Sequence, residues 1–313
     1  MTSGEMEGVR SVKTVLKKAG FTVSPVYSKP SCFNLAARKD DSLILIKVQP
    51  DIGGISPHDS SELRVICENI LAASLIIGDK TREKPLEDDT VYFRYNVPAV
   101  TFRTFKNIIL KKIYPLVQAG PGGYYVEVDG EALRQRRQKL SLSAGMIAEK
   151  IGVSRRTLYG YERGMTRTSV SIAYKLLCTL GAPIAKSVDI FNISTRKDKT
   201  SIKKKAKRLI TKSKVFQRIF KNVSGYEVIP VRKTPFDFLI TNQEDNIKII
   251  GSVTNGKEES LSQRVSEILS LSKVVQARAI LVTEDKKAEN VGIPCVPREK
   301  ISKIRDPEEL CNI

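Results

Sequence analysis

The chain has 313 residues with 41% apolar content, which is enough for more than one buried core, and its net charge of +19 favours a polyanionic partner. It contains no apolar run of the roughly 20 residues that a membrane span needs, and acids stand near its start where a secretory signal would be basic. We therefore expect two or three domains in a cytoplasmic, nucleoid-associated protein that does not bind membranes.

The N-terminal third has the pattern of an α/β domain, which we place at residues 1–119. Apolar residues at helical spacing predict a first helix that Gly20 ends. The expected strand at residues 43–48 is apolar throughout, and such strands are usually covered on both faces, so we predict a mixed sheet with helices around it. The other predicted elements are strands at 21–27, 33–38, 75–77, 91–94 and 99–102 and helices at 59–73 and 105–114.

Two breaks end this region. Pro115 is expected to stop the helix at residues 105–114. The segment Gly120-Pro121-Gly122-Gly123 then predicts a domain boundary, because glycine and proline interrupt regular structure.

Residues 124–190 have the pattern of a helix-turn-helix domain. Gly152 interrupts the helical period where a residue without Cβ can take a positive φ, and Ala148 is small where the second helix would cross the first. Ser154 is the expected N-cap of a reading helix over residues 154–163. The five apolar side chains expected between the two helices are Ile147, Ile151, Val153, Leu158 and Tyr161. Short helix pairs with a glycine turn also occur in enzymes, and that alternative stays open.

Residues 191–222 form a basic connector, with 12 basic and one acidic residue. More than half of the net charge of +19 therefore lies beside the helix-turn-helix. Apolar residues keep a helical spacing along this stretch, which predicts one long helix or two short ones. The lysines could be a solvated linker or could contact DNA phosphates, and the sequence leaves both open.

The last region, residues 223–313, repeats the first. The repeat predicts two copies of one α/β domain on either side of a DNA-binding module. The matched segments occur in the same order and are 20–26 with 225–231, 33–35 with 236–238, and 97–100 with 293–296.

The two copies also resemble the PD-(D/E)xK nuclease fold, in which two carboxylates hold Mg²⁺ and a lysine helps to activate water. In the first copy the acidic positions hold Asn34 and Leu45, and only Lys47 is kept. In the second copy Asp237 stands in the first acidic position, but residues 247–253 contain no acid. One carboxylate does not hold hydrated Mg²⁺ tightly. We therefore expect a degenerate scaffold without metal or catalysis, with Asp237 in a turn or cap.

Other common chemistries lack their motifs. The cysteines show no CxxC spacing, and with the single histidine, His58, they cannot form a usual zinc site. No dinucleotide-binding fingerprint, P-loop or nucleophile elbow is present. We expect no cofactor, His58 in a loop or cap, and reduced buried cysteines, which are Cys32, Cys67, Cys178, Cys295 and Cys311.

The stretch LRQRRQKLSLSAGMIAEKIGVSRRTLYGYERG closely resembles the lambda Cro and repressor type of helix-turn-helix. Over the whole chain the order of domains resembles archaeal HTH-type transcriptional regulators, in which this module lies between two restriction-endonuclease-like halves. The resemblance implies a five-helix module in which Arg137 pairs with Glu162, and base contacts from the first turn of the reading helix. Two departures are Ala144, where such modules often carry a phosphate-contacting Gln, and Gly160, which weakens the helix by about 1 kcal/mol relative to Ala.

Together these patterns predict a multi-domain protein, α/β plus all-α, that binds double-stranded DNA sequence-specifically and regulates transcription as a homodimer. Arg155 and Arg156 would present forked donors to guanine edges in the major groove, and the flanking domains would make the dimer contact. The residues expected to hold the module together are Arg137, Ala148, Gly152, Val153, Leu158 and Glu162. The expected DNA contacts are Ser143, Ser154, Arg155, Arg156, Thr157, Tyr159, Arg163, Arg167, Lys203, Lys204 and Lys205.

Two other functions remain open. The chain could be a coactivator that bridges the basal transcription machinery, as multiprotein bridging factors with a similar module do, and it would then show little base preference. It could instead be a Mg²⁺-dependent, structure-specific nuclease that uses Asp237 and a second acid.

Overall fold

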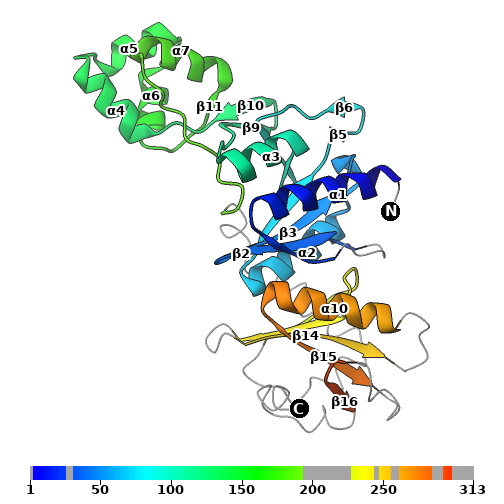
Figure 1. Cartoon of the computed structure of the whole chain (residues 1–313). Coiled ribbons are helices and arrows are strands. Elements are labelled where there is room, and N and C mark those ends of the chain that lie inside the picture. Colours follow the sequence, from blue (N-terminus) through cyan, green and yellow to red (C-terminus); the bar gives the residue numbers. More distant parts are fainter. Residues whose placement is uncertain are drawn as a thin grey trace.

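The structure is a computed structural model, and it describes residues 3–25, 31–192, 227–242, 247–254, 261–283 and 292–297. An α/β domain lies in the middle of the molecule, a helical module projects from one end of it, and a second α/β half lies at the opposite end (Figure 1).

The N-terminal domain is a mixed sheet with helices on both faces. Its strands are β1 (Thr22–Val23), β2 (Leu35–Lys39), β3 (Ser42–Val48), β4 (Ala73–Ile77), β7 (Thr90–Arg94) and β8 (Val97–Val100), in the order β1-β2-β3-β4-β8-β7. The helices are α1 (Ser3–Lys18), α2 (Pro57–Ile70) and α3 (Phe102–Lys111), with a short 3₁₀ turn, η1 (Ile52–Gly54), and a small hairpin of β5 (Lys80–Thr81) and β6 (Lys84–Pro85).

Alternate side chains of β3 enter two different cores. Ile44 and Ile46 pack with α1 and α3, whereas Leu43 and Leu45 pack on the face that α2 covers. This alternation explains why β3 is apolar throughout, and the predicted mixed sheet with helices on both faces is confirmed.

The helix ends differ from the predicted ones because capping side chains set them. Helix α3 begins three residues earlier than expected, since the Thr101 hydroxyl accepts the Thr104 N–H. It ends at Lys112, whose φ of 58° is left-handed, so Pro115 is not the residue that stops it. Helix α2 likewise begins after the cap Ser56 and ends at the left-handed Leu71.

The glycine-rich segment at residues 120–123 lies in a hairpin turn, and not at the domain boundary that we expected. It joins β9 (Val117–Gly120) to β10 (Gly123–Val126), and Gly122 there has a φ of 81°. Strand β9 pairs in parallel with β7, and β10 pairs with β11 (Thr168–Ser169), which gives one nine-stranded sheet. The sheet therefore continues from the first domain into the helical module.

The chain also returns from the module to the first domain. Val188 and Ile190, which we had placed with the helix-turn-helix, pack in the core formed by α1 and α3. The Val188 N–H donates to the Pro115 carbonyl at 2.8 Å. The segments that enter and leave the helical module are thus both attached to the N-terminal domain.

The C-terminal half has the same strand plan as the N-terminal domain. Its elements are β12 (Glu227–Pro230), β13 (Phe238–Asn242), β14 (Ile247–Thr254), α10 (Leu261–Val275), β15 (Arg278–Thr283) and β16 (Cys295–Pro297). The order β12-β13-β14-β15-β16 has two antiparallel pairs followed by two parallel pairs, as β1-β2-β3-β4-β8 has. In both, one helix connects the third and fourth strands of the sheet, which supports the internal repeat read from the sequence.

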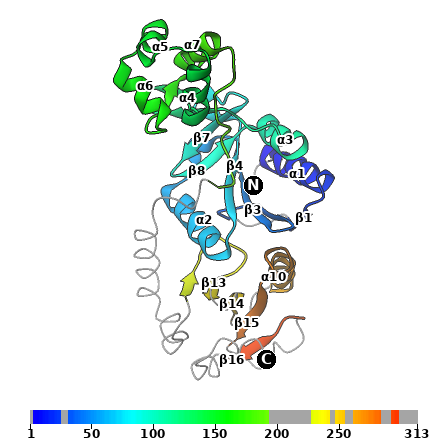
Figure 2. The ribbon, with the colours of Figure 1, turned by 90° about the vertical axis from the view of Figure 1, so that its left-hand side faces the viewer.

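The two halves pack against each other with an approximate two-fold relation. Helix α2 lies against β13, and its counterpart α10 lies against β2 (Figures 1 and 2). Arg38 of β2 donates to the carbonyls of Val274 and Val275 at the end of α10, at 2.7 and 3.2 Å. Thr241 of β13 donates in the equivalent way to Asn69 near the end of α2, at 3.3 Å. One apolar core runs through both halves, so they are joined as the subunits of a dimer would be.

Candidate nucleic-acid interface

The helical module has four helices among the described residues. They are α4 (Gly130–Lys139), α5 (Ala144–Ile151), α6 (Arg155–Glu162) and α7 (Val170–Leu180). The five-helix arrangement that the resemblance implied is therefore not seen in the described part of the chain. The apolar residues expected between the helices, with Ala148, form one core in which Val153 is half-buried and the others are buried.

The turn between α5 and α6 has the geometry that the sequence indicates. Gly152 follows α5 with a φ of 77°, and its N–H bonds to the carbonyls of Ala148 and Glu149. The Ser154 hydroxyl accepts the Thr157 N–H at 3.0 Å and so caps α6. Arg163 follows the last helical residue, so the element occupies the expected range of residues 154–163.

The outer surface of α6 is basic. Arg155, Arg156 and Tyr159 are exposed, Tyr159 to 47%, and so are Arg163 and Arg167 beyond the helix. Two further hydroxyls have structural roles: Thr157 contacts Ser154 at 2.8 Å, and Ser143 accepts the Met146 N–H as the cap of α5. Lys203, Lys204 and Lys205 lie outside the described residues.

Arg155 connects the two helices on this surface. A Cβ added at Gly145 in the first turn of α5 would lie 2.8 Å from its Nε and 3.1 Å from its Cζ, so the guanidinium rests on this glycine. The sequence analysis missed Gly145. A glycine inside a short helix was the available signal, since it lowers helix propensity and needs a packing reason. The first turns of α5 and α6 thus form one continuous surface, on which Arg155 supplies the positive charge.

A buried ion pair holds α6 on α4. Arg137 donates to both carboxylate oxygens of Glu162, with distances of 2.6 and 3.2 Å, and also to the Leu142 carbonyl at 3.3 Å. The side chains are exposed to only 15% and 6%, and the Glu162 carboxylate raises the pKa of Arg137. This is the pair that the family resemblance implies. The start of α4 also packs closely on the end of α6. A Cβ added at Gly130 would lie 2.3 Å from the Glu162 carbonyl oxygen, so only glycine fits there.

The nuclease-like positions do not offer a magnesium site. Leu45 is fully buried in an apolar core, and the Asn34 side chain accepts the Val48 N–H at 2.7 Å. Asp237 is not a simple turn or cap residue: its carboxylate pairs with Arg264 at 2.6 Å and accepts from Ser252 and Val253 at 2.6 and 2.8 Å. Among the residues that the structure describes, no group of three His, Cys, Asp or Glu side chains could hold a metal ion. The residues present therefore do not fit Mg²⁺.

Comparison with known proteins finds family models that match two parts of the chain. Residues 5–115 match the PD-(D/E)XK superfamily domain, and residues 133–186 match a helix-turn-helix family. Relatives named "Putative HTH-type transcriptional regulatory protein" match over almost the whole length. The protein of Methanocaldococcus jannaschii is 33% identical over 290 residues, which are 91% of this chain and 90% of the relative. The chain belongs to this archaeal family.

Other members of the family match equally broadly. The Archaeoglobus fulgidus protein is 33% identical over 288 residues, covering 90% of this chain and 89% of its own. The Pyrococcus furiosus protein is 29% identical over 303 residues, which are 96% of this chain and 95% of the relative. The family assignment supports a DNA-binding regulator of transcription, with the helix-turn-helix match on α4 to α7. None of the described helices is long and apolar enough to cross a membrane.

Proposed function

We propose that this regulator binds double-stranded DNA sequence-specifically, with α6 in the major groove and Arg155 and Arg156 at base edges. The observation that carries the proposal is the exposed basic surface of α6, which the buried Arg137–Glu162 pair holds in a fixed position on α4. A rigid helix with exposed arginines in its first turn suits bidentate contacts to guanine. The enzymatic alternative is disfavoured because Asp237 is engaged by Arg264 and residues 247–253, where the second acid of the same copy would stand, contain none.

Selection of bound sequences from a random DNA pool, followed by a cleavage assay on the same complexes with Mg²⁺, tests this function. We expect one enriched motif and no cleavage. Binding to protein partners without an enriched motif would favour the coactivator that bridges basal factors. Mg²⁺-dependent cleavage that Asp237→Ala abolishes would favour the nuclease.

Base-reading and phosphate-contacting residues should respond differently to substitution. Arg155→Ala or Arg156→Ala should cost about 1–3 kcal/mol of discrimination between the selected motif and its variants. Replacing Lys203, Lys204 and Lys205 together with Gln should weaken binding to all sequences and flatten its salt dependence. The measurement is the dissociation constant for matched and mismatched sites over a range of salt. If the arginine variants changed only the salt slope, direct base readout would be wrong.

We further propose a homodimer, but with a contact different from the one first expected. The faces of the flanking halves that carry α2 and α10 pack against each other within one chain and are not available. On the module itself, Val170, Tyr174 and Leu177 form an exposed apolar stripe along α7, with exposed fractions of 41%, 66% and 41%. A second copy on this stripe would place two reading helices on one DNA site, as two-fold related half-sites require.

Light scattering of the full chain, free and on its selected site, tests the dimer. We expect a dimer that Tyr174→Lys converts to a monomer, while the exposed control Lys111→Glu on α3 leaves the mass unchanged. A monomer under both conditions would remove this contact from the account.

A further inference from the structure

A small pocket lies where β3 faces the first turns of α2. Its volume is about 50 Å³, and its lining includes Cys32, Lys47, Gln49, Asp59, Ser60 and Leu63. A water-sized probe occupies roughly 10–15 Å³, so the pocket has room for about three to five non-hydrogen atoms. Of the three nuclease-like positions in the N-terminal domain, only Lys47 lines this pocket, and Asn34 and Leu45 do not.

The polar groups of this pocket are mainly hydrogen-bond donors. The Lys47 ammonium donates to the Ser31 carbonyl at 2.9 Å, which leaves it two further N–H groups. Ser60 is only 2% exposed, and its hydroxyl has no hydrogen-bond partner in the described part of the chain. Burial raises the pKa of the Cys32 thiol, so Cys32 keeps its proton, and Gln49 can donate through its amide.

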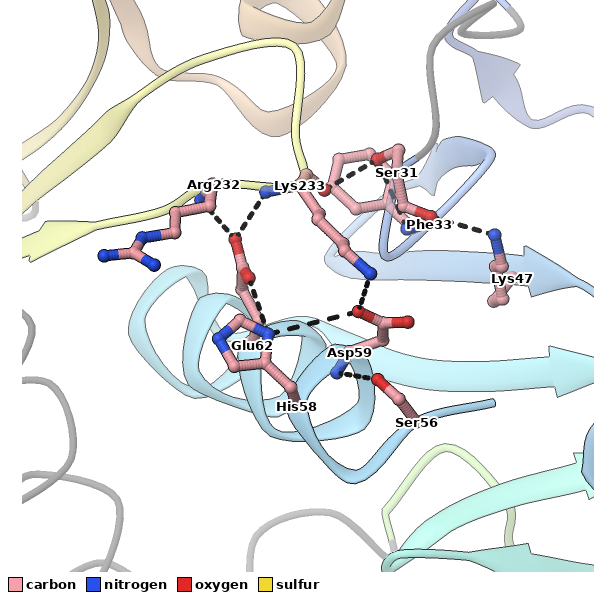
Figure 3. A network of polar contacts seen from close by, with 9 residues as sticks. All are labelled: Ser31, Phe33, Lys47, Ser56, His58, Asp59, Glu62, Arg232 and Lys233. Atoms are coloured by element: carbon pink, nitrogen blue, oxygen red, sulfur yellow. Dashed lines mark hydrogen bonds and ion pairs between the residues drawn. The ribbon is translucent and has the colours of Figure 1, made fainter. Parts of the chain in front are cut away.

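The one acid in the lining is already neutralised. Asp59 pairs with the Lys233 ammonium of the C-terminal half at 2.7 Å (Figure 3). The Lys47 ammonium donates to a neutral carbonyl instead, and its burial lowers its pKa although the charges of Glu5 and Asp59 favour the ammonium. An anion would relieve this cost, because a buried charge is stable only when it is paired.

The same residues join the two halves of the protein. The Cys32 N–H donates to the Lys233 carbonyl at 2.8 Å, and Asp59 holds the Lys233 ammonium. Next to them, Glu62 accepts the backbone N–H groups of Arg232 and Lys233 (Figure 3). A ligand in the pocket would therefore contact two of the residues that fix Lys233.

We propose that this pocket binds a small oxyanion, such as inorganic phosphate or acetate, between Lys47 and Ser60, and that the bound anion stabilises the junction between the two halves. The pocket would thus be an effector site next to the contact between the two halves. The inference does not depend on the mode of DNA binding, because it concerns residues far from α6 (Figure 1).

Calorimetric titration of the full chain with inorganic phosphate and with acetate tests binding. The ionic strength is held constant with chloride, because a chain of charge +19 attracts anions non-specifically. We expect saturable binding of one anion per chain. Ser60→Ala and Lys47→Met should each weaken it about tenfold or more, whereas the exposed control Lys84→Met should leave it unchanged. Absence of saturable binding, or equal binding by all variants, would overturn the site.

Two further experiments test whether the ligand is a free anion or a nucleic-acid phosphate, and whether its binding stabilises the junction between the two halves. Dimethyl phosphate, which stands for a nucleic-acid phosphodiester, should bind at least about tenfold more weakly than phosphate, because its two methyl groups cover oxygens that would otherwise accept hydrogen bonds from Lys47 and Ser60. Equal binding of the two compounds would overturn the assignment to a free anion.

Hydrogen exchange at the Arg232 and Lys233 amides of the wild-type protein should slow severalfold in saturating phosphate. The same amides in Ser60→Ala should show no such slowing. Unchanged exchange in the wild type would overturn the link to the junction.

Discussion

Replacing Glu162 with alanine is expected to destabilise the helix-turn-helix module by about 2–3 kcal/mol, because the Arg137 charge loses its partner in a part-buried contact, which costs less than the same loss in a fully buried one. The Glu162 carboxylate is 6% exposed and accepts two hydrogen bonds from Arg137, which itself is 15% exposed. Its loss also frees α6 from α4. DNA binding should therefore fall together with stability, although Glu162 contacts Arg137 of α4 and is not part of the exposed basic surface of α6.

Hydrogen exchange of the α6 amides measures this effect within the module. The Leu158 N–H, which bonds to the Ser154 carbonyl at 3.1 Å, is a suitable reporter. The control is Glu131→Ala, since Glu131 is exposed and its carboxylate accepts from Gln135 on the surface of α4. We expect the control to change stability by less than about 0.5 kcal/mol. If Glu162→Ala behaved like Glu131→Ala, the pair would not fix the reading helix.

Replacing Glu62 with alanine is expected to open the junction between the two α/β halves, at a cost of about 2–4 kcal/mol. One carboxylate oxygen of Glu62 accepts the N–H groups of both Arg232 and Lys233, and the residue is 8% exposed. Arg232 and Lys233 are exposed residues and these hydrogen bonds are part-buried, so each N–H that loses its partner should cost about 1–2 kcal/mol, toward the low end of the penalty for an unsatisfied donor. His58 lies in the first turn of α2, and not in a loop, with its Nδ1 3.6 Å from Glu62 Oε2 and its side chain 52% exposed, so it shields Glu62 from solvent only in part (Figure 3).

The conservative variant separates hydrogen bonding from packing. Glu62→Gln keeps a carbonyl oxygen that can accept both N–H groups, so it should lose much less stability than Glu62→Ala. Exchange rates of the Arg232 and Lys233 amides, together with urea unfolding, report the difference, and the exposed Glu83→Ala serves as the control. Equal protection of these amides in Glu62→Ala and the wild type would show that Glu62 does not hold the halves together.

Local features of the fold could be predicted from the sequence, because they depend on neighbouring residues. The turn at Gly152 and the cap at Ser154 are set by a positive φ and by a hydroxyl three residues before the N–H it accepts. The apolar strand β3 likewise indicates cover on both faces. The start of α3 was not predicted because residues 99–102 have the pattern of a strand, whereas Thr101 is a helix cap and Phe102 is the first helical residue.

Long-range contacts could not be predicted in this way. Nothing local in residues 120–123 distinguishes a linker from a hairpin turn, since both favour glycine and proline. That β9 pairs with β7 depends on the position of the whole sheet. The Lys233–Asp59 ion pair joins residues far apart in the chain, and the role of Asp237 became clear only when Arg264 was found beside it.

The most direct test of the account is binding to the selected DNA site in which single guanines are replaced by 7-deazaguanine. This base lacks the N7 acceptor in the major groove and leaves the phosphates and the minor groove unchanged. We expect the affinity of the wild-type protein to fall about tenfold or more when one or more specific guanines are replaced. At those positions the replacement should cause no further loss of affinity in Arg155→Ala or Arg156→Ala. Full binding at every substituted guanine would show that these arginines do not read bases in the major groove.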